Sequence, residues 1–354
     1  MTFVIAAGGT GGHVMPGLAV AKELRKRGHE ALFVGTSKGM EAVLAPQAGF
    51  PLHLLKVGAL KQVSWARRIR TLMELPLSFV DAAKMLEWVR PHAVFSMGGY
   101  AAGPVTLMAI AKGIPVVVME PNAMPGFTNR VIGPFISKAL LGFEEAKRFF
   151  PHGRAEVTGI PIREEFFHIA PKRHQAPFTV LITGGSQGSH RLNEAGPAAA
   201  ALAEQTKWRG CIVFLHQAGK NEYNDVCFRY QKAGARAEVE PFIENMPQAF
   251  ARADIVVCRA GASAVAELSA AGKASILVPF PFAADQHQLH NARSMQAAGA
   301  GSLIEDSALT GQRLFEELQA LLETPGRLGE MEAAARKLAR PGAAQRAADI
   351  LEQI

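Results

Sequence analysis

The sequence predicts a mixed α/β protein made of two doubly wound domains, each built on a parallel sheet. Short β-branched runs alternate with longer helical stretches, and a similar strand, glycine turn and helix occur twice. The runs are apolar without strict alternation, which is typical of parallel strands buried on both faces. Helical connections between such strands follow the right-handed crossover rule and favour open α/β sheets.

The expected strands fall into two groups along the chain. The first group comprises the runs Phe3–Ala7, Ala31–Gly35, Ala93–Met97, Pro115–Met119 and Lys138–Gly142. After a proline-flanked segment near Gly159–Pro161, the second comprises Phe178–Thr183, Cys211–Gln217, Arg236–Val239, Asp254–Cys258 and Ala274–Pro279. We therefore expect an N-terminal domain over residues 1–160 and a C-terminal domain over residues 161–340. A last helix, within residues 341–354, has no strand after it and is expected to pack back toward the N-terminal domain.

An internal repeat supports two similar domains. Phe3–His13 and Phe178–His190 each contain an apolar strand, a Gly-Gly turn with a hydroxyl residue, further glycine and a histidine before a helix. Two copies of the same opening unit predict two Rossmann-like domains that face each other across a cleft.

Composition limits the classes of protein that are possible. The chain has 354 residues, of which 49% are hydrophobic, so it can bury a core in each domain and is not disordered. Three cysteines in a chain of this length indicate a reducing compartment rather than a disulfide scaffold. A secretory signal is not expected, and apolar runs stay shorter than the ~18–20 residues that span a bilayer.

The positive charge is concentrated in the first half of the chain. The net charge is +7, and residues 1–160 hold 18 Lys and Arg against 10 Asp and Glu. Such an excess suits nucleic acid, an anionic membrane surface or a phosphorylated substrate. Three Trp, three Tyr and the lack of a basic–aromatic strand motif argue against nucleic acid.

The segment Trp65–Arg70 favours a membrane surface. Trp65 stands beside Arg67, Arg68 and Arg70, within a run of bulky apolar residues. Apolar side chains can enter the interface while basic side chains meet anionic headgroups. The alternative is an ordinary amphipathic helix on the core. Further basic residues that could extend the patch are Arg130, Lys138 and Lys147.

The loop Gly8–His13 is the first candidate binding site. Its glycines let a ligand approach the backbone, and the following helix start favours anions. The motif is neither G-x-G-x-x-G nor a P-loop, which disfavours nicotinamide cofactors and ATP. His13 is a candidate general base, the alternative being a helix N-terminal histidine bonded to backbone.

Two further loops follow expected strands of the first domain. Ser96–Tyr100 contains a Gly-Gly pair, which could serve either a ligand or plain helix–strand packing. Glu120 and Asn122 are polar groups at the end of an apolar run, and either could bond a sugar hydroxyl. Glu120 could instead orient His13, and Asn122 could cap the next helix.

In the second domain, Cys258–Glu267 reads as a strand followed by a helix start rich in small residues. A nucleotide could lie against this backbone, and Glu267 could accept hydrogen bonds from a ribose diol; the alternative is a carboxylate favoured by the helix dipole. Asp285–Gln288 and Asn291 fit sugar hydroxyls. His287 lacks the Cys/His spacing of a zinc site and no Asp-x-Asp pair occurs, so we expect no metal.

Taken together and in this order, the motifs resemble the MurG family, the N-acetylglucosaminyltransferases of peptidoglycan synthesis, which have the GT-B fold. They are Gly8–His13, Met97–Tyr100, Glu120–Asn122, Gly184–Gly188 and Arg259–Glu267. The resemblance covers essentially the whole chain.

The resemblance implies an inverting hexosyltransferase of cell-wall synthesis, and with it a part in cell shape and division. It would move N-acetylglucosamine from UDP-N-acetylglucosamine to the C4 hydroxyl of the muramoyl unit of lipid I, giving lipid II. It would need no cofactor or metal and would work peripherally at the cytoplasmic face of the bacterial inner membrane. The alternative is another GT-B UDP-sugar transferase with a glycolipid acceptor.

The resemblance also implies roles for individual residues. His13 matches the proposed general base, Ser186 a donor phosphate contact, Ile243 a residue whose backbone reads uracil, and Glu267 the ribose ligand. The implied substrate-binding residues are Thr10, Gly11, Gly12, Tyr100, Glu120, Asn122, Arg163, Ser186, Ile243, Ala262, Ser263, Ala264, Val265, Ala266, Glu267, His287 and Gln288.

The sequence departs from the family pattern in places. Ile160 precedes Pro161 where the family usually has Asn, and Pro121 stands where Gln is common. The GlcNAc contact falls on either His287 or Gln288.

Overall fold

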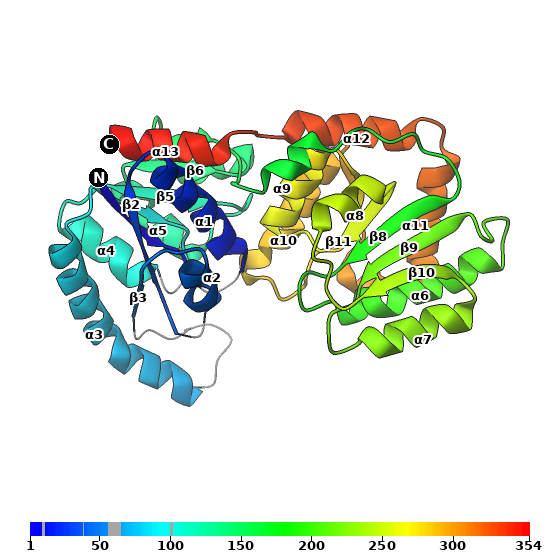
Figure 1. Ribbon diagram of the computed structural model, residues 1–354, viewed down its shortest axis with the longest axis horizontal. Coiled ribbons are helices and arrows are strands. Elements are labelled where there is room, and N and C mark those ends of the chain that lie inside the picture. The colour runs from blue at the N-terminus through cyan, green and yellow to red at the C-terminus, as the bar shows by residue number, and fades with distance from the viewer. Residues whose placement is uncertain (9–10, 38, 56–64, 100–101) are drawn as a thin grey trace. The chain divides into compact units, whose positions relative to one another are not determined.

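The computed structural model describes residues 1–8, 11–37, 39–55, 65–99 and 102–354, without the side chains of residues 11 and 65–75. The chain forms two compact units, drawn in Figure 1. Unit 1 comprises Met1–Arg163 and Gly342–Ile354, and unit 2 comprises Glu164–Pro341. Both units are α/β with parallel sheets, which confirms the predicted fold class.

The sheet of unit 1 has seven strands in the described residues, in the order β3-β2-β1-β4-β5-β6-β7. Its strands are β1 (Thr2–Ala6), β2 (Glu30–Gly35), β3 (Leu52–Leu54), β4 (Ala93–Ser96), β5 (Val116–Glu120), β6 (Lys138–Leu141) and β7 (Ala155–Val157). Its helices are α1 (Gly11–Lys26), α2 (Glu41–Gln47), α3 (Trp65–Val89), α4 (Gly103–Ala111), α5 (Phe127–Ile132) and α13 (Ala343–Gln353), with short 3-10 turns at Gly133–Phe135 and Glu144–Phe149.

The central strand of unit 1 is buried on both faces. Phe3 and Ile5 of β1 join one apolar cluster, which also contains Leu24 of α1 and Leu351 of α13. Val4, between them, joins a second cluster on the other face of the sheet, with Leu86 of α3 and Val105 of α4. Alternate side chains of one strand therefore anchor helices on opposite faces, which explains the continuous apolar run.

Unit 2 repeats this plan with six strands among its described residues, in the order β10-β9-β8-β11-β12-β13. Its strands are β8 (Phe178–Thr183), β9 (Ile212–Gln217), β10 (Arg236–Glu240), β11 (Ile255–Cys258), β12 (Ala274–Leu277) and β13 (Gly301–Leu303). Its helices are α6 (His190–Glu204), α7 (Tyr223–Ala233), α8 (Met246–Arg252), α9 (Ala262–Ala271), α10 (His287–Ala297), α11 (Gly311–Glu323) and α12 (Arg327–Leu338), with 3-10 turns at Glu164–His168, Ala284–Gln286 and Asp306–Ala308.

The expected strands are all present, and β3, β7 and β13 are additions. Each of these is three residues long and pairs at the edge of its sheet. A short edge strand buries too little to show a continuous apolar run. The strand order of both sheets follows the doubly wound pattern, in which ligands bind outside the carboxyl ends of the strands where the order reverses.

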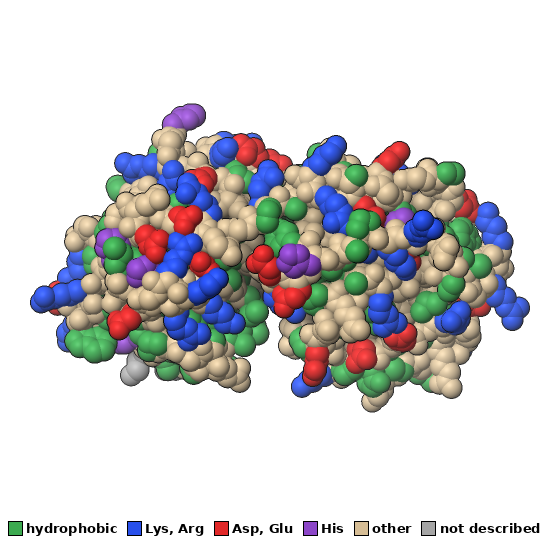
Figure 2. Space-filling model, turned by 45° about the horizontal axis from the view of Figure 1, so that its top comes forward, with side chains coloured by type: hydrophobic (Ala, Val, Ile, Leu, Met, Phe, Trp, Pro, Cys, Tyr) green, Lys and Arg blue, Asp and Glu red, His purple; other side chains and the backbone are tan. Residues whose placement is uncertain are grey.

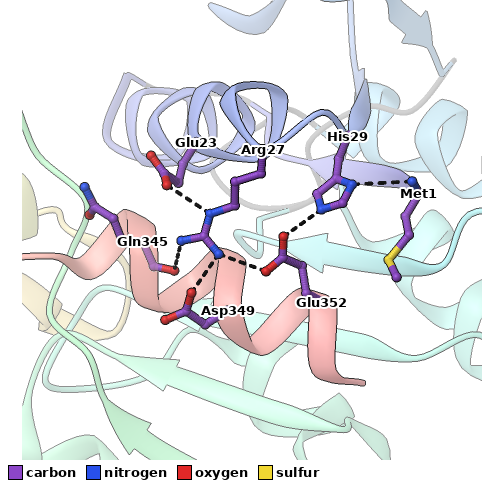
Figure 3. Close-up of polar contacts among 7 residues, drawn as sticks. All are labelled: Met1, Glu23, Arg27, His29, Gln345, Asp349 and Glu352. Carbon is purple, nitrogen blue, oxygen red and sulfur yellow. Dashed lines mark hydrogen bonds and ion pairs between the residues drawn. The ribbon is translucent and has the colours of Figure 1, made fainter.

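Helix α13 packs on unit 1 although unit 2 precedes it in the chain. Its Ala347, Ile350 and Leu351 belong to the same cluster as Phe3 and Ile5. Polar contacts also join this helix to unit 1, as Figure 3 shows: the Arg27 guanidinium donates to Asp349 and Glu352, and His29 bonds Glu352. The last helix is thus a structural part of the first sheet domain.

Charges of both signs are interspersed on the face shown in Figure 2, with small apolar areas between them. Helix α3 begins at the predicted surface residue Trp65, and the side chains of Trp65–Arg70 lie outside the described residues. Among the described helices, none is long and apolar enough to cross a membrane.

Candidate active site

Apart from Arg163, the described candidate site residues of unit 1 lie at the carboxyl ends of its central strands β1 and β5 or in the segments that follow them. The strand order places β1 beside β4 and β4 beside β5, so the loops after these strands are neighbours. A Cβ added at Gly99 would stand 3.6 Å from the Gly8 carbonyl oxygen, which shows that the first and second glycine loops touch. Gly98 and Gly99 both have positive φ, at 75° and 80°, a conformation that favours glycine.

His13 lies in the first turn of α1, close to the end of β1, and its side chain is half-buried. The helix approaches the strand closely because Gly17 carries no side chain: a Cβ there would meet the Ala7 Cβ at 3.1 Å and the Ile5 Cγ2 at 3.3 Å. This close packing sets the start of α1, and so His13, at the edge of the sheet. Gly11 and Gly12 begin the same helix, whereas Thr10 and Tyr100 lie outside the described residues.

Hydrogen bonds of two buried hydroxyl groups, those of Ser96 and Thr106, hold the loop after β4 in place. The Gly98 amide donates to the Ser96 Oγ at 3.3 Å. The Thr106 hydroxyl lies 3.0 Å from the same Ser96 oxygen and 2.7 Å from the Ala102 carbonyl. Buried hydrogen bonds of this kind fix the path of the glycine loop without occupying its outer surface.

Glu120 is a buried carboxylate that organises its own loop. Its Oε1 accepts hydrogen bonds from the Asn122 amide at 3.0 Å and from the Asn122 Nδ2 at 3.2 Å. Its Oε2 accepts from the Gly126 amide at 3.0 Å and from the Asn129 Nδ2 at 2.9 Å. Only 2% of the residue is exposed. Burial raises the pKa of the Glu120 carboxyl, and these hydrogen bonds oppose the rise.

Glu120 was expected either to bond a sugar hydroxyl or to orient His13, and its hydrogen bonds show a third role. Both carboxylate oxygens already accept hydrogen bonds from the loop, so Glu120 shapes the segment that carries Asn122. Asn122 itself is half-buried at the surface of the loop, at the end of β5. A contact from either residue to a sugar hydroxyl stays a prediction.

In unit 2 the second copy of the glycine loop follows β8. Gly185 and Gly188 have φ of 89° and 77°, and a Cβ at Gly188 would lie 2.0 Å from the Ala218 carbonyl oxygen. The loop after β9 therefore packs directly on the glycine backbone. Ser186 is exposed at the tip of the loop, and α6 begins just after it, at His190. An exposed hydroxyl and a helix start are groups that bind phosphate.

The small-residue segment expected at the nucleotide forms the start of α9. Ala262, Ser263, Ala264, Val265, Ala266 and Glu267 open this helix, and all except Val265 are half-buried. Glu267 lies close enough to the buried Cys258 for its charge to act on it. Burial, together with that charge, raises the pKa of the Cys258 thiol to about 12, so this cysteine is an uncharged core residue.

The two residues expected near the transferred sugar are both held by backbone groups. The His287 Nδ1 donates to the Ala284 carbonyl at 2.7 Å. The Gln288 Oε1 accepts from the Phe280 amide at 2.9 Å, which turns its NH₂ end away from Phe280. Asn291, in the same helix, is buried and donates to the Ala260 carbonyl at 3.1 Å, tying α10 to the start of α9.

Arg163 and Ile243 complete the expected set. Arg163 is exposed in the segment that follows β7, at the end of the first stretch of unit 1. Ile243 lies between β10 and α8, half-buried, and its amide donates to the Gln217 Oε1 at 2.8 Å. Within the described ranges, no group of three or more His, Cys, Asp or Glu side chains could hold a metal ion.

Arg259 and Gln217 are organising residues that were not among the expected site residues, although Arg259 opens the Arg259–Glu267 motif. The Arg259 guanidinium donates to the Ser189 Oγ at 2.7 Å, to the Val278 carbonyl at 3.2 Å and to the Asp306 carboxylate. It thereby joins the loops after β8, β11 and β12. The sequence signal that could have identified them is their position, because each is a polar residue at the end of an apolar strand run.

Comparisons with known proteins identify the class of enzyme that carries these loops. The glycosyltransferase family 28 N-terminal domain matches residues 3–141, and the family 28 C-terminal domain matches residues 179–354. The chain belongs to glycosyltransferase family 28. The family models confirm the predicted assignment as a glycosyltransferase. Relatives that match the whole chain confirm the predicted resemblance to the MurG family.

Relatives of this chain carry a name that is more specific than the family description. A protein of Solibacter usitatus is 50% identical over 353 residues, covering 100% of this chain and 96% of its own length. One of Myxococcus xanthus is 42% identical, covering 99% and 92%. Each is named UDP-N-acetylglucosamine–N-acetylmuramyl-(pentapeptide) pyrophosphoryl-undecaprenol N-acetylglucosamine transferase.

Solved structures agree with this likeness. The crystal structure of Acinetobacter baumannii MurG superposes with a TM-score of 0.84 at 31% identity, covering 100% of this chain and 99% of that one. The calicheamicin glycosyltransferase CalG4 superposes with a TM-score of 0.70 at 18% identity, covering 99% and 97%, and so shares the fold alone.

Proposed function

We propose that this enzyme transfers N-acetylglucosamine from UDP-N-acetylglucosamine to lipid I, the undecaprenyl-diphosphoryl N-acetylmuramyl pentapeptide, to form lipid II. One observation carries the proposal: a relative with that named activity is 50% identical over the full length of this chain. The glycine loops of both units support it, since they supply backbone amides and helix starts where two substrates with diphosphate groups need them.

Unit 2 is the proposed donor side. Ser186 and the backbone after Gly185 would contact the diphosphate, the start of α9 would lie along the nucleotide, and Glu267 would accept from the ribose hydroxyls. Ile243 would read the base through its backbone, and Arg163 would stand near the nucleotide. His287 or Gln288 would bond the transferred sugar.

Unit 1 is the proposed acceptor side. His13 would take the proton of the acceptor hydroxyl as that oxygen forms its bond to the anomeric carbon. The bond from that carbon to the UDP oxygen breaks on the opposite face, so the configuration inverts. The developing charge on UDP would be stabilised by backbone amides and by the N-terminal ends of α6 and α9. Thr10, Gly11, Gly12, Tyr100 and Asn122 would line the acceptor and diphosphate.

Peripheral attachment to the cytoplasmic face of the inner membrane is part of the proposal, with a role in wall growth, cell shape and division. Helix α3 supports it: Leu77, Val80 and Trp88 are 70%, 52% and 82% exposed. With the exposed Lys84 they recur at helical spacing and so share one face. Exposed apolar residues beside a lysine suit an anionic lipid surface.

The activity is tested by following labelled GlcNAc from the UDP sugar to a lipid I analogue, with and without EDTA. Transfer that persists in EDTA is expected. Transfer to another glycolipid but not to lipid I would favour the alternative GT-B enzyme, and full loss in EDTA would contradict metal-free transfer.

Membrane attachment is tested separately, by sedimentation with vesicles that contain or lack anionic lipid. The Leu77→Ser/Trp88→Ser variant should bind anionic vesicles more weakly than the wild type. Phe228→Ser removes a side chain of unit 2 that is 63% exposed and serves as the matched control. Equal binding by the wild type and the α3 variant would reject this surface.

A further inference from the structure

Gln217 is a buried side chain that holds together loops from two different strands. It is the last residue of β9 and is 2% exposed. Its Nε2 donates to the Gly185 carbonyl at 2.8 Å and to the Thr183 Oγ1 at 3.2 Å. Its Oε1 accepts from the Ile243 amide at 2.8 Å. One carboxamide therefore connects the glycine loop after β8 with the loop after β10.

The sheet explains why this position can do so. Strand β9 lies between β8 and β10, and Gln217 is in register with Thr183 on one side and Glu240 on the other. At the end of the middle strand, a side chain is flanked by the loops that leave both neighbours. Gln217 thus occupies the position from which the spacing of these loops can be set.

The chemistry of the contacts is specific to an amide. The side chain must donate on the glycine-loop side, where the partner is a carbonyl, and accept on the other side, where the partner is an N–H. Glutamate would offer the Gly185 carbonyl another acceptor, and methionine would serve neither loop. Because the residue is buried, a lost partner is not replaced readily by water.

The glycine loop also has contacts besides those that it makes with Gln217. The Gly185 amide donates to the Thr183 Oγ1 at 3.3 Å. A Cβ at Gly219 would lie 2.2 Å from the Gln187 carbonyl oxygen, so the two backbones are in direct contact. The loop therefore keeps its shape from several contacts, while its distance to Ile243 is bridged by Gln217.

We propose that Gln217 is a positioning residue that sets the distance between the diphosphate-binding loop and the base-reading backbone at Ile243. This inference rests on the proposed function, in which a uridine diphosphate sugar spans these loops. A ligand that must meet both loops at once gains affinity from their correct spacing, whereas a ligand that touches one of them does not.

The test compares UDP with uridine, which lacks the diphosphate, by equilibrium titration of the full chain. In Gln217→Glu the contact to Ile243 can persist while the contact to Gly185 is lost. UDP affinity should fall about 10- to 100-fold and uridine affinity should change far less. In Gln217→Met both ligands should bind more weakly, and the preference of UDP over CDP should also fall.

Ser275→Ala is the matched control, because Ser275 is buried in β12 of the same sheet and bonds the Ala300 carbonyl instead of the loops. It should lower thermal stability without changing the UDP to uridine ratio. Wild-type ratios in both Gln217 variants, or equal losses of UDP and uridine in Gln217→Glu, would overturn the positioning role. Failure of the wild type to bind UDP would instead refute the proposed function, and this inference with it.

Discussion

The Arg27 guanidinium, just after α1, donates a hydrogen bond of 2.7 Å to the Asp349 carboxylate of α13, across 322 positions of sequence. The same guanidinium bonds Glu352 at 2.9 Å and the Gln345 carbonyl at 3.2 Å, as drawn in Figure 3. The hydrogen bond to Asp349 is the main cause that raises the pKa of Arg27. The cluster orients α13 on unit 1 and adds to the apolar contact of Ala347, Ile350 and Leu351.

We expect Arg27→Ala to loosen α13. The free energy of unfolding should fall by about 1 kcal/mol, since several partly exposed partners lose one cation. Amide exchange of residues 343–353 should accelerate more than exchange in β8. Lys26→Ala, a change of the exposed neighbouring residue, is the control. Unchanged exchange in α13 would show that its apolar face alone attaches it.

Stability should also depend on the charge of Glu352. The hydrogen bond from His29, at 2.6 Å, is the main cause that lowers the pKa of Glu352 from 4.5, and Arg27 adds to it. A carboxylate with a lowered folded-state pKa stabilises the fold above its unfolded pKa and loses that contribution as the pH falls through the folded value.

The stability difference between wild type and Glu352→Gln should therefore be full above pH 4.5 and shrink below it. Urea unfolding over a pH series measures this difference. Glu305→Gln, at an exposed position of unit 2, should show no such dependence. A difference that grew on acidification would have the wrong sign for this carboxylate.

His13→Ala should lower kcat by about 10²–10⁴-fold, the usual contribution of a general base, and leave the KM for UDP-N-acetylglucosamine little changed. Initial rates with a lipid I analogue measure both constants. His152→Ala removes an exposed histidine of unit 1 and should have normal rates. Normal turnover in His13→Ala would exclude it as the base.

Glu267→Ala should act on donor binding instead. It removes hydrogen bonds proposed for the ribose in both the ground state and the transition state, so KM for the donor should rise about 10- to 100-fold. Steady-state kinetics with the donor varied are the measurement. Glu244→Ala, exposed between β10 and α8, provides a charge-matched control. If only kcat fell, the ribose assignment would be incorrect.

Glu120→Gln should destabilise unit 1. Each Glu120 oxygen now accepts two hydrogen bonds, and the NH₂ group of glutamine would replace one of these oxygens. Two N–H donors would then lack an acceptor, at a cost of about 2 kcal/mol. Urea unfolding measures the loss, with the exposed Glu144→Gln as control. A change within about 0.5 kcal/mol would mean that the loop after β5 does not depend on the carboxylate.

The fold could be predicted from the sequence because its central strands are buried on both faces. Runs such as Phe3–Ala7 and Phe178–Thr183 are apolar for that reason, and both became central strands. The edge strand β3, over Leu52–Leu54, is half-exposed and three residues long, so its pattern does not differ from that of a loop.

The site was predictable as a set of loops and less so as a set of contacts. Glu120 was identified because a carboxylate at the end of an apolar run is unusual. Its partners Gly126 and Asn129 were not predictable, because they depend on the path of the loop. Gln217 was missed for a similar reason: its importance arises from strand order, which places β9 between the strands whose loops it joins.

The position of α13 has a consequence for how the protein is made. Ala347, Ile350 and Leu351 cover the cluster that contains Phe3 and Ile5. On the ribosome, the strands and helices of unit 1 that precede unit 2 can assemble early, yet the part of the apolar surface that α13 covers stays open until unit 2 has been synthesised. An uncovered apolar surface promotes aggregation, so the maturation of unit 1 is tied to the completion of the other unit.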